Sequence, residues 1–182
     1  MKNIKFSRLF AAVAFVAVLA LAGCKQQVEE PKKIEGTWVS SWGEKFVISG
    51  SEVKNYYGSS LCYAGNLVEI NEINDKSGIV YFKYTRAYEK VTTEPNPSTG
   101  WTHAAASSYG PENWYRYSET APDVGNWYAL SYVELTDKSV RICGASKVGG
   151  KTSCPTLAEA KTEFTVLNKY FPESNYSTCV KQ

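Results

Sequence analysis

The chain offers little material for nucleophilic or acid–base catalysis. Its single histidine, His103, lies in the segment Gly100-Trp101-Thr102-His103, and neither a G-x-S-x-G nor an H-E-x-x-H pattern occurs. A hydrolase needs a nucleophile, a base and usually an orienting carboxylate within reach of one another. We therefore expect no catalytic residue and no enzyme activity. His103 is interpreted as a solvated, packed or ligand-contacting side chain.

The N-terminus has the three parts of a secretory signal peptide. Lys2, Lys5 and Arg8 form a positive start, residues 9–23 are an almost unbroken apolar run, and small residues precede Cys24. The run is shorter than the ~20 residues that a helix needs to cross the hydrocarbon core of a bilayer. We therefore predict that residues 1–23 are a removable signal and not a permanent anchor.

The end of this segment, Leu21-Ala22-Gly23-Cys24, resembles the lipobox of bacterial lipoproteins. The resemblance implies that a diacylglycerol is joined to the Cys24 thiol and that a peptidase cleaves before Cys24. Fatty acyl chains such as palmitate would then hold the protein on a bilayer, because two or more chains anchor stably. The alternative is an ordinary secretory signal with a chance cysteine. Neither Lys25 nor Gln26 is the Asp that retains many Gram-negative lipoproteins in the inner membrane, so the outer membrane is favoured.

The formal charge of the whole chain, +2, changes when the signal is set aside. Three of the 20 basic residues and none of the 18 acidic residues lie in residues 1–23, which leaves 17 basic against 18 acidic residues and a charge of −1. No basic stripe remains, so nucleic-acid binding is not expected. Residues 24–35 are polar and predict a flexible tether. Residues 36–182 suit a single β-rich domain.

The four cysteines after Cys24 are Cys62, Cys143, Cys154 and Cys179. None forms the close C-x₂₋₄-C pair of a zinc site, so no metal and no cofactor is expected. An even number of cysteines in an exported chain suggests two disulfides, with three possible pairings. We favour Cys154–Cys179, because these two bracket one helix-like segment, and Cys62–Cys143 then follows by elimination.

Period-two alternation of apolar and polar residues predicts a mainly β fold. The expected strands lie at residues 36–40, 45–49, 53–57, 67–73, 79–86, 127–135 and 139–143, with a further short strand at 114–117. Seven or eight strands at such short spacing favour an antiparallel barrel or a sandwich.

One helix is predicted near the C-terminus. Thr156 and Glu159 form a capping box, and Ala160, Phe164 and Leu167 then share one helical face. We expect the helix to run over residues 157–167 and to pack on the barrel wall, with residues 168–182 irregular and held by Cys179.

Residues 87–125 form a long segment rich in proline and in aromatic residues. Such a segment predicts an ordered loop that folds back on the barrel, and long ordered loops are often functional. Tyrosine and tryptophan join apolar area to a polar tip and are common where proteins meet ligands or partners. The candidate contact residues are Trp101, His103, Tyr109, Trp114 and Tyr117. By contrast, the strand aromatics Phe82, Tyr84, Tyr128 and Tyr132 are predicted to fill the barrel core.

The start Gly36-Thr37-Trp38, followed by hairpins and one late helix, resembles the lipocalin and wider calycin group. The resemblance implies an antiparallel barrel whose closed end is plugged by Trp38, and the group's arginine on a late strand could be Arg141. The Thr-Asp-Tyr element of true lipocalins is missing. Segments such as residues 125–132 (GNWYALSY) also resemble uncharacterised spirochaetal lipoproteins, which implies no known activity.

Two functions remain open. The first is a membrane-anchored module that holds a small apolar or aromatic ligand at the mouth of a lipocalin-like barrel, for which an apolar cavity of a few hundred Å³ is expected. The second is a surface lipoprotein that contacts a protein or glycan through residues 87–125, for which Trp101, Tyr109 and Trp114 should be exposed together. In both cases the bilayer is a partner through acylated Cys24.

Overall fold

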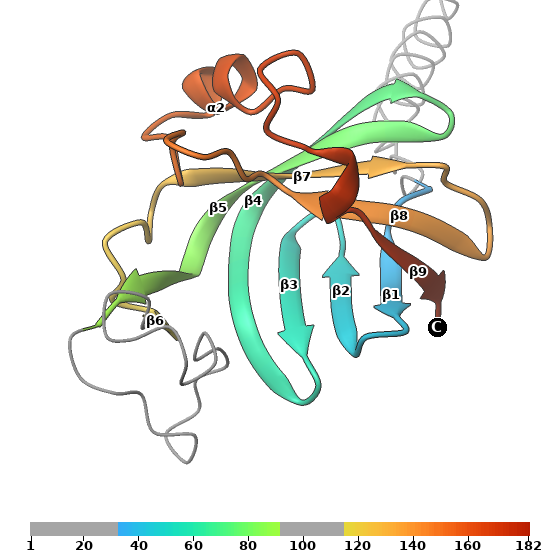
Figure 1. Cartoon of the computed structure of the whole chain (residues 1–182), viewed down its shortest axis with the longest axis horizontal. Coiled ribbons are helices and arrows are strands. Elements are labelled where there is room, and N and C mark those ends of the chain that lie inside the picture. Colours follow the sequence, from blue (N-terminus) through green and yellow to red (C-terminus); the bar gives the residue numbers. More distant parts are fainter. Residues whose placement is uncertain (1–32, 92–114) are drawn as a thin grey trace, which may run out of the picture. The chain divides into compact units, whose positions relative to one another are not determined.

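Antiparallel strands build the fold (Figure 1). Along β1, β2 and β3, buried positions alternate with more exposed ones. A computed structural model describes residues 33–91 and 115–182. The described residues belong to one compact unit. The strands are β1 (Gly36–Ser40), β2 (Glu44–Ile48), β3 (Glu52–Tyr57), β4 (Ser60–Asn74), β5 (Ser77–Lys90), β6 (Tyr115–Ser118), β7 (Trp127–Val133), β8 (Ser139–Gly144) and β9 (Ser177–Lys181). No helix within the described ranges is long and apolar enough to cross a membrane.

Eight of these strands close into a barrel. The order is β1-β2-β3-β4-β5-β7-β8-β9, each strand is antiparallel to its neighbours, and β9 pairs with β1 to complete the circle. β6 is an extra strand that pairs only with the end of β5. The predicted mainly β, calycin-like antiparallel barrel is therefore confirmed.

The barrel wall separates two apolar clusters. Inward residues of every strand pair fill the interior, and the largest fully buried ones include Trp38, Phe46 and Phe82. Outward residues of β5 and β7, such as Tyr81 and Ala129, form a second cluster under the C-terminal segment. The two clusters follow directly from the period-two alternation of strands.

The second cluster is covered by α2 (Leu157–Glu163), which lies beside β5 and β7 (Figure 1). As predicted, Thr156 is the N-cap, and its side chain accepts a hydrogen bond from the Glu159 amide at 3.2 Å. The predicted end at residue 167 is wrong. The helix stops before Phe164, and the Asn168 side chain donates to the carbonyls of Thr162 and Glu163, which satisfies carbonyls left open at the helix end.

Two other boundaries differ from the prediction. β4 begins at Ser60, seven residues before the predicted strand, because register shifts near residues 54–56 and 64–69 interrupt the alternation. Residues 168–182 are not irregular throughout: a short 3₁₀ helix (Glu173–Asn175) leads into β9, which closes the barrel. A five-residue strand with one buried position gives little periodicity to detect.

One end of the barrel is sealed around Trp38. The ring is fully buried, and its indole nitrogen donates to the Ile34 carbonyl at 2.7 Å. The Lys181 ammonium lies 5.1 Å from the centre of the ring. The tentative assignment of Arg141 to this place is wrong, because Arg141 points outward from β8 and forms ion pairs with Glu134 and Glu173. A lysine on the final strand takes the position over the tryptophan.

Neither predicted disulfide is present. The four cysteines are buried, and no disulfide links any two of them. Cys179 belongs to the interior cluster, whereas Cys143 and Cys154 belong to the outer cluster, so the wall separates Cys154 from Cys179. The order of cysteines along the chain was therefore a poor guide to their distance in space, because Cys179 faces inward from β9 whereas Cys154 lies in the segment outside the barrel wall.

Candidate ligand pocket

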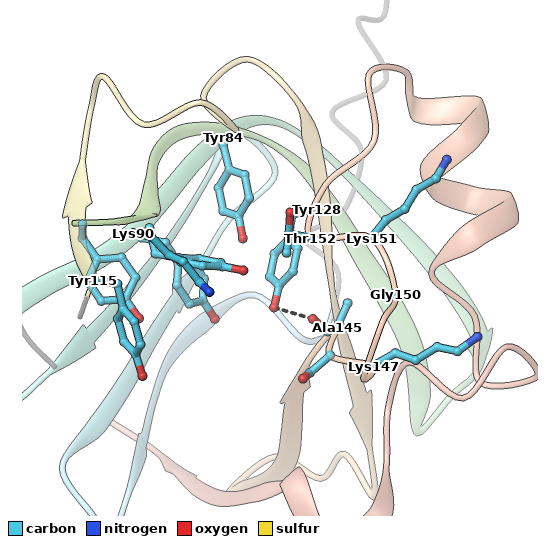
Figure 2. A pocket seen from close by; sticks show the side chains of 13 residues that line it. Tyr84, Lys90, Tyr115, Tyr128, Ala145, Lys147, Gly150, Lys151 and Thr152 are labelled. Carbon is cyan, nitrogen blue, oxygen red and sulfur yellow. Dashed lines mark hydrogen bonds between the residues drawn. The ribbon is translucent and has the colours of Figure 1, made fainter. Parts of the chain in front are cut away.

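A pocket opens beside Tyr84 of β5 and Tyr128 at the start of β7 (Figure 2). Trp38 lies toward the other end of the barrel, because it pairs with Lys181, whose amide donates to the Lys138 carbonyl in the turn after β7. Its volume is about 470 Å³, within the range of small-molecule sites. Its walls consist of six tyrosines, three lysines and four small residues. We call this site the tyrosine pocket, and its lining residues are Tyr63, Tyr84, Tyr88, Lys90, Tyr115, Tyr117, Tyr128, Ala145, Ser146, Lys147, Gly150, Lys151 and Thr152.

Three adjacent strands supply the inner wall. Tyr63 comes from β4, Tyr84 from β5 and Tyr128 from β7. The rings of Tyr84 and Tyr128 stack with centroids 5.0 Å apart, and Tyr63 meets Tyr128 edge to face at 5.9 Å. Phe82, which is fully buried, contacts all three rings from the barrel core. Such ring contacts hold the wall in place, because aromatic pairs prefer these stacked and edge geometries.

A second wall is built where β5 continues beyond the barrel. β6 pairs with this extension, so that Tyr88 stands opposite Tyr117 and Lys90 stands opposite Tyr115. The rings of Tyr88 and Tyr115 meet edge to face at 6.2 Å. The extra strand, which closes no part of the barrel, thus contributes two aromatic side chains to the tyrosine pocket.

The third wall is the segment after β8, residues 145–152. The Tyr128 hydroxyl donates to the Ala145 carbonyl at 2.9 Å, which joins this segment to the inner wall (Figure 2). From the outer side, the Lys151 amide donates to the Tyr170 hydroxyl at 2.7 Å. Gly150 is required here, because a Cβ at this position would stand only 2.6 Å from the Tyr170 hydroxyl. The segment is therefore fixed to the barrel on one side and to the chain after α2 on the other.

Five phenols of the tyrosine pocket, those of Tyr63, Tyr84, Tyr88, Tyr117 and Tyr128, stay protonated near neutral pH. Burial raises the pKa of Tyr63, Tyr84, Tyr117 and Tyr128 well above the ordinary value of 10. Burial also raises the pKa of Tyr88, although a hydrogen bond with Thr152 acts the other way. Neutral hydroxyls can both donate and accept hydrogen bonds. The pocket therefore combines apolar ring faces with several polar tips.

A polar group of residues lies inside the same end of the barrel. The Glu44 carboxylate accepts hydrogen bonds from the Asn55 amide at 3.2 Å and from the Ser177 hydroxyl at 2.7 Å. The buried Ser40 hydroxyl accepts from the Glu44 amide. Each carboxylate oxygen of Glu44 thus has a partner from the protein. This group joins β1, β2, β3 and β9, and its polar atoms are matched within the wall.

The structure tests only part of the predicted site. Tyr117 lines the tyrosine pocket, whereas Trp101, His103, Tyr109 and Trp114 lie outside the described residues. A surface contact through residues 87–125 therefore stays a prediction. Lys90 and Tyr115, two described residues of the segment 87–125, both line the tyrosine pocket.

Several lining residues were missed or assigned otherwise from the sequence. Tyr84 and Tyr128 were predicted as core, and they do contact the interior cluster, but they also face the pocket. Tyr63 follows a stretch whose alternation is broken by a register shift, so no strand was predicted there. The available signal was that Tyr84 lies near the end of the predicted strand 79–86 and Tyr128 near the start of the predicted strand 127–135. The segment 145–152 carried none.

Comparison with known proteins assigns this chain to no family. No family model, no curated protein and no solved structure matches this chain.

Proposed function

We propose that this protein is a lipid-anchored extracytoplasmic binding module that holds a small, partly aromatic molecule in the tyrosine pocket. The observation that carries the proposal is a pocket of about 470 Å³ at one end of an otherwise filled eight-stranded barrel. The interior of an eight-stranded barrel is just wide enough for side chains to fill it or for one small ligand to bind there. Cys24, with its lipobox, supports the anchor, and Lys25 and Gln26 favour the outer membrane.

The lining supports a ligand with ring or apolar character. Six tyrosines offer aromatic faces together with hydroxyls that can orient polar groups. Ligand sites in proteins commonly combine a largely apolar wall with a few placed polar groups. The rings of Tyr63, Tyr84 and Tyr128 are already held by one another and by Phe82, so these three side chains would lose little freedom on binding.

Titration with the neutral fluorophore N-phenyl-1-naphthylamine tests the proposal. The full chain in non-ionic detergent should show a saturable fluorescence increase with one site per chain. Thr152→Trp should remove this component, because it places a large ring at an exposed position of the pocket wall. The matched control is Thr178→Trp, an equally large change at an exposed position on the outer face of β9. Equal signals from the two variants would refute the proposal.

A further inference from the structure

The charged side chains that line the tyrosine pocket are all positive. Its lining contains three lysines and no aspartate or glutamate. The two carboxylates that act on its phenols, Glu44 and Asp123, do not belong to the lining. Both oxygens of Glu44 already accept hydrogen bonds from Asn55 and Ser177. A charged ligand group in the pocket would therefore meet ammonium groups before it met a carboxylate.

The three lysines are not equivalent. Figure 2 shows the Lys90 ammonium directed toward the tyrosine rings, whereas the side chains of Lys147 and Lys151 extend away from them. The Lys147 ammonium lies 5.4 Å from the ring centre of Tyr170, which belongs to the outer cluster. Within residues 33–91 and 115–182, Lys90 has no such ring contact, and no carboxylate forms an ion pair with it. Its ammonium group thus faces the pocket without a partner of either kind in this part of the chain.

The other polar groups suit the same kind of ligand. Burial keeps the Tyr63 and Tyr117 phenols neutral, so each of them can donate one hydrogen bond to a ligand, whereas the Tyr128 hydroxyl already donates to the Ala145 carbonyl. An anionic oxygen binds more strongly to such donors than a neutral one does. Resting on the proposed function, we infer that the ligand is an aromatic molecule bearing one anionic group, a carboxylate, sulfonate or phosphate, and that Lys90 selects for this charge. The rings would hold its body, and the Lys90 ammonium would hold the anion.

Two probes with the same ring system test this inference. 8-Anilinonaphthalene-1-sulfonate differs from N-phenyl-1-naphthylamine by one sulfonate group. Both are titrated into the full chain in non-ionic detergent, and the signal of the Thr152→Trp variant is subtracted as background. The wild-type chain should bind the sulfonate about fivefold more tightly, as expected for an ion pair that water still reaches. The fivefold ratio of the two affinities should decrease in 0.5 M salt, because salt screens exposed charges.

Charge-removing variants assign the preference to one residue. Lys90→Met and Lys90→Gln should both abolish the preference for the sulfonate, measured as the ratio of the dissociation constants of the two probes. The matched control is Lys83→Met, which makes the same change of charge on the same strand at a position outside the pocket lining. It should keep the fivefold preference. The unfolding temperature of each variant shows whether the fold is retained.

The possible failures are distinguishable. Equal binding of the two probes by the wild-type chain, or equal losses in the Lys90 and Lys83 variants, would overturn the inference and leave the proposed function in place. Absence of saturable binding for either probe would overturn the proposed function and the inference together.

Discussion

Replacing Trp38 by phenylalanine should destabilise the barrel without affecting the tyrosine pocket. The substitution removes the buried hydrogen bond of 2.7 Å from the indole nitrogen to the Ile34 carbonyl. The loss of this bond, with the carbonyl left buried, costs roughly 2 kcal/mol. The smaller ring also leaves unfilled space in a fully buried position, which adds about 1 kcal/mol. The expected total is therefore about 3 kcal/mol of the free energy of unfolding.

Urea unfolding followed by far-ultraviolet circular dichroism measures this loss, because the midpoint shifts while the slope stays constant. For a domain of this size the same change lowers the melting temperature by roughly 6–12 °C. The control is Trp42→Phe, the same chemical change at a side chain that is 80% exposed in the β1–β2 turn. It should alter stability by less than about 0.5 kcal/mol.

Binding of N-phenyl-1-naphthylamine shows whether Trp38→Phe affects the tyrosine pocket as well as the stability of the barrel. Trp38→Phe should leave the affinity of the pocket unchanged at a temperature where the variant is folded, because Trp38 lies at the opposite end. A loss of stability below about 1 kcal/mol, or losses of equal size for Trp38→Phe and Trp42→Phe, would refute the role given to this residue.

Further predictions concern packing, ionisation and capping. Gly65→Ala should cost about 2–3 kcal/mol of stability in urea unfolding, because the new Cβ would stand 2.6 Å from a backbone carbonyl of β5. The control is Gly50→Ala, whose Cβ would have no neighbour closer than 3.9 Å and which should be nearly neutral. Burial raises the pKa of the Cys143 and Cys179 thiols from 9.0 to about 12. Above pH 9 the unfolded chain therefore releases these two protons before the folded chain does. The stabilisation should be fully present below pH 9 and should fall as the pH rises from 9 toward 12. Urea midpoints at pH 8 and pH 10.5 measure the fall, and a flat profile would contradict the burial of these thiols. Thr156→Ala should cost about 1 kcal/mol in the same assay, because the Thr156 side chain satisfies an amide in the first turn of α2.

The absence of disulfides yields a separate expectation. After unfolding without reductant, a Cys24→Ser chain should show four thiols reactive to Ellman's reagent, and the folded chain should show almost none because all four are buried. Two or fewer thiols in the unfolded chain would contradict the structure and restore a disulfide. The two predicted disulfides had seemed to agree with export, so their absence leaves the export proposal resting on residues 1–24 alone.

Most strands of the barrel could be predicted from the sequence, because each of them buries one face. Alternation placed β1, β2, β3, β5, β7 and β8 to within a few residues of their observed bounds. The same rule fails at the start of β4, where register shifts put consecutive residues out of step. It also fails at β9, whose identity as a strand depends on pairing with β1 and β8, both distant in the sequence.

The pocket was less predictable than the barrel, for a physical reason. Its walls come from strand ends, from an extra strand and from the segment 145–152, which converge only after the barrel closes. Nothing in the local pattern distinguishes an inward tyrosine in the core, such as Tyr132, from one at the rim, such as Tyr128. That distinction depends on the stagger between strands, which a single sequence does not encode locally.

Native mass spectrometry of the protein, purified from its own cells without denaturation, tests whether a ligand occupies the tyrosine pocket. We expect one bound small molecule per chain on the wild-type protein and on Thr178→Trp, and none on Thr152→Trp. The mass released on unfolding would identify the ligand and show whether it carries an anionic group. An adduct of equal abundance on both variants, or no adduct on the wild-type protein under conditions that preserve non-covalent complexes, would contradict a ligand held in the tyrosine pocket.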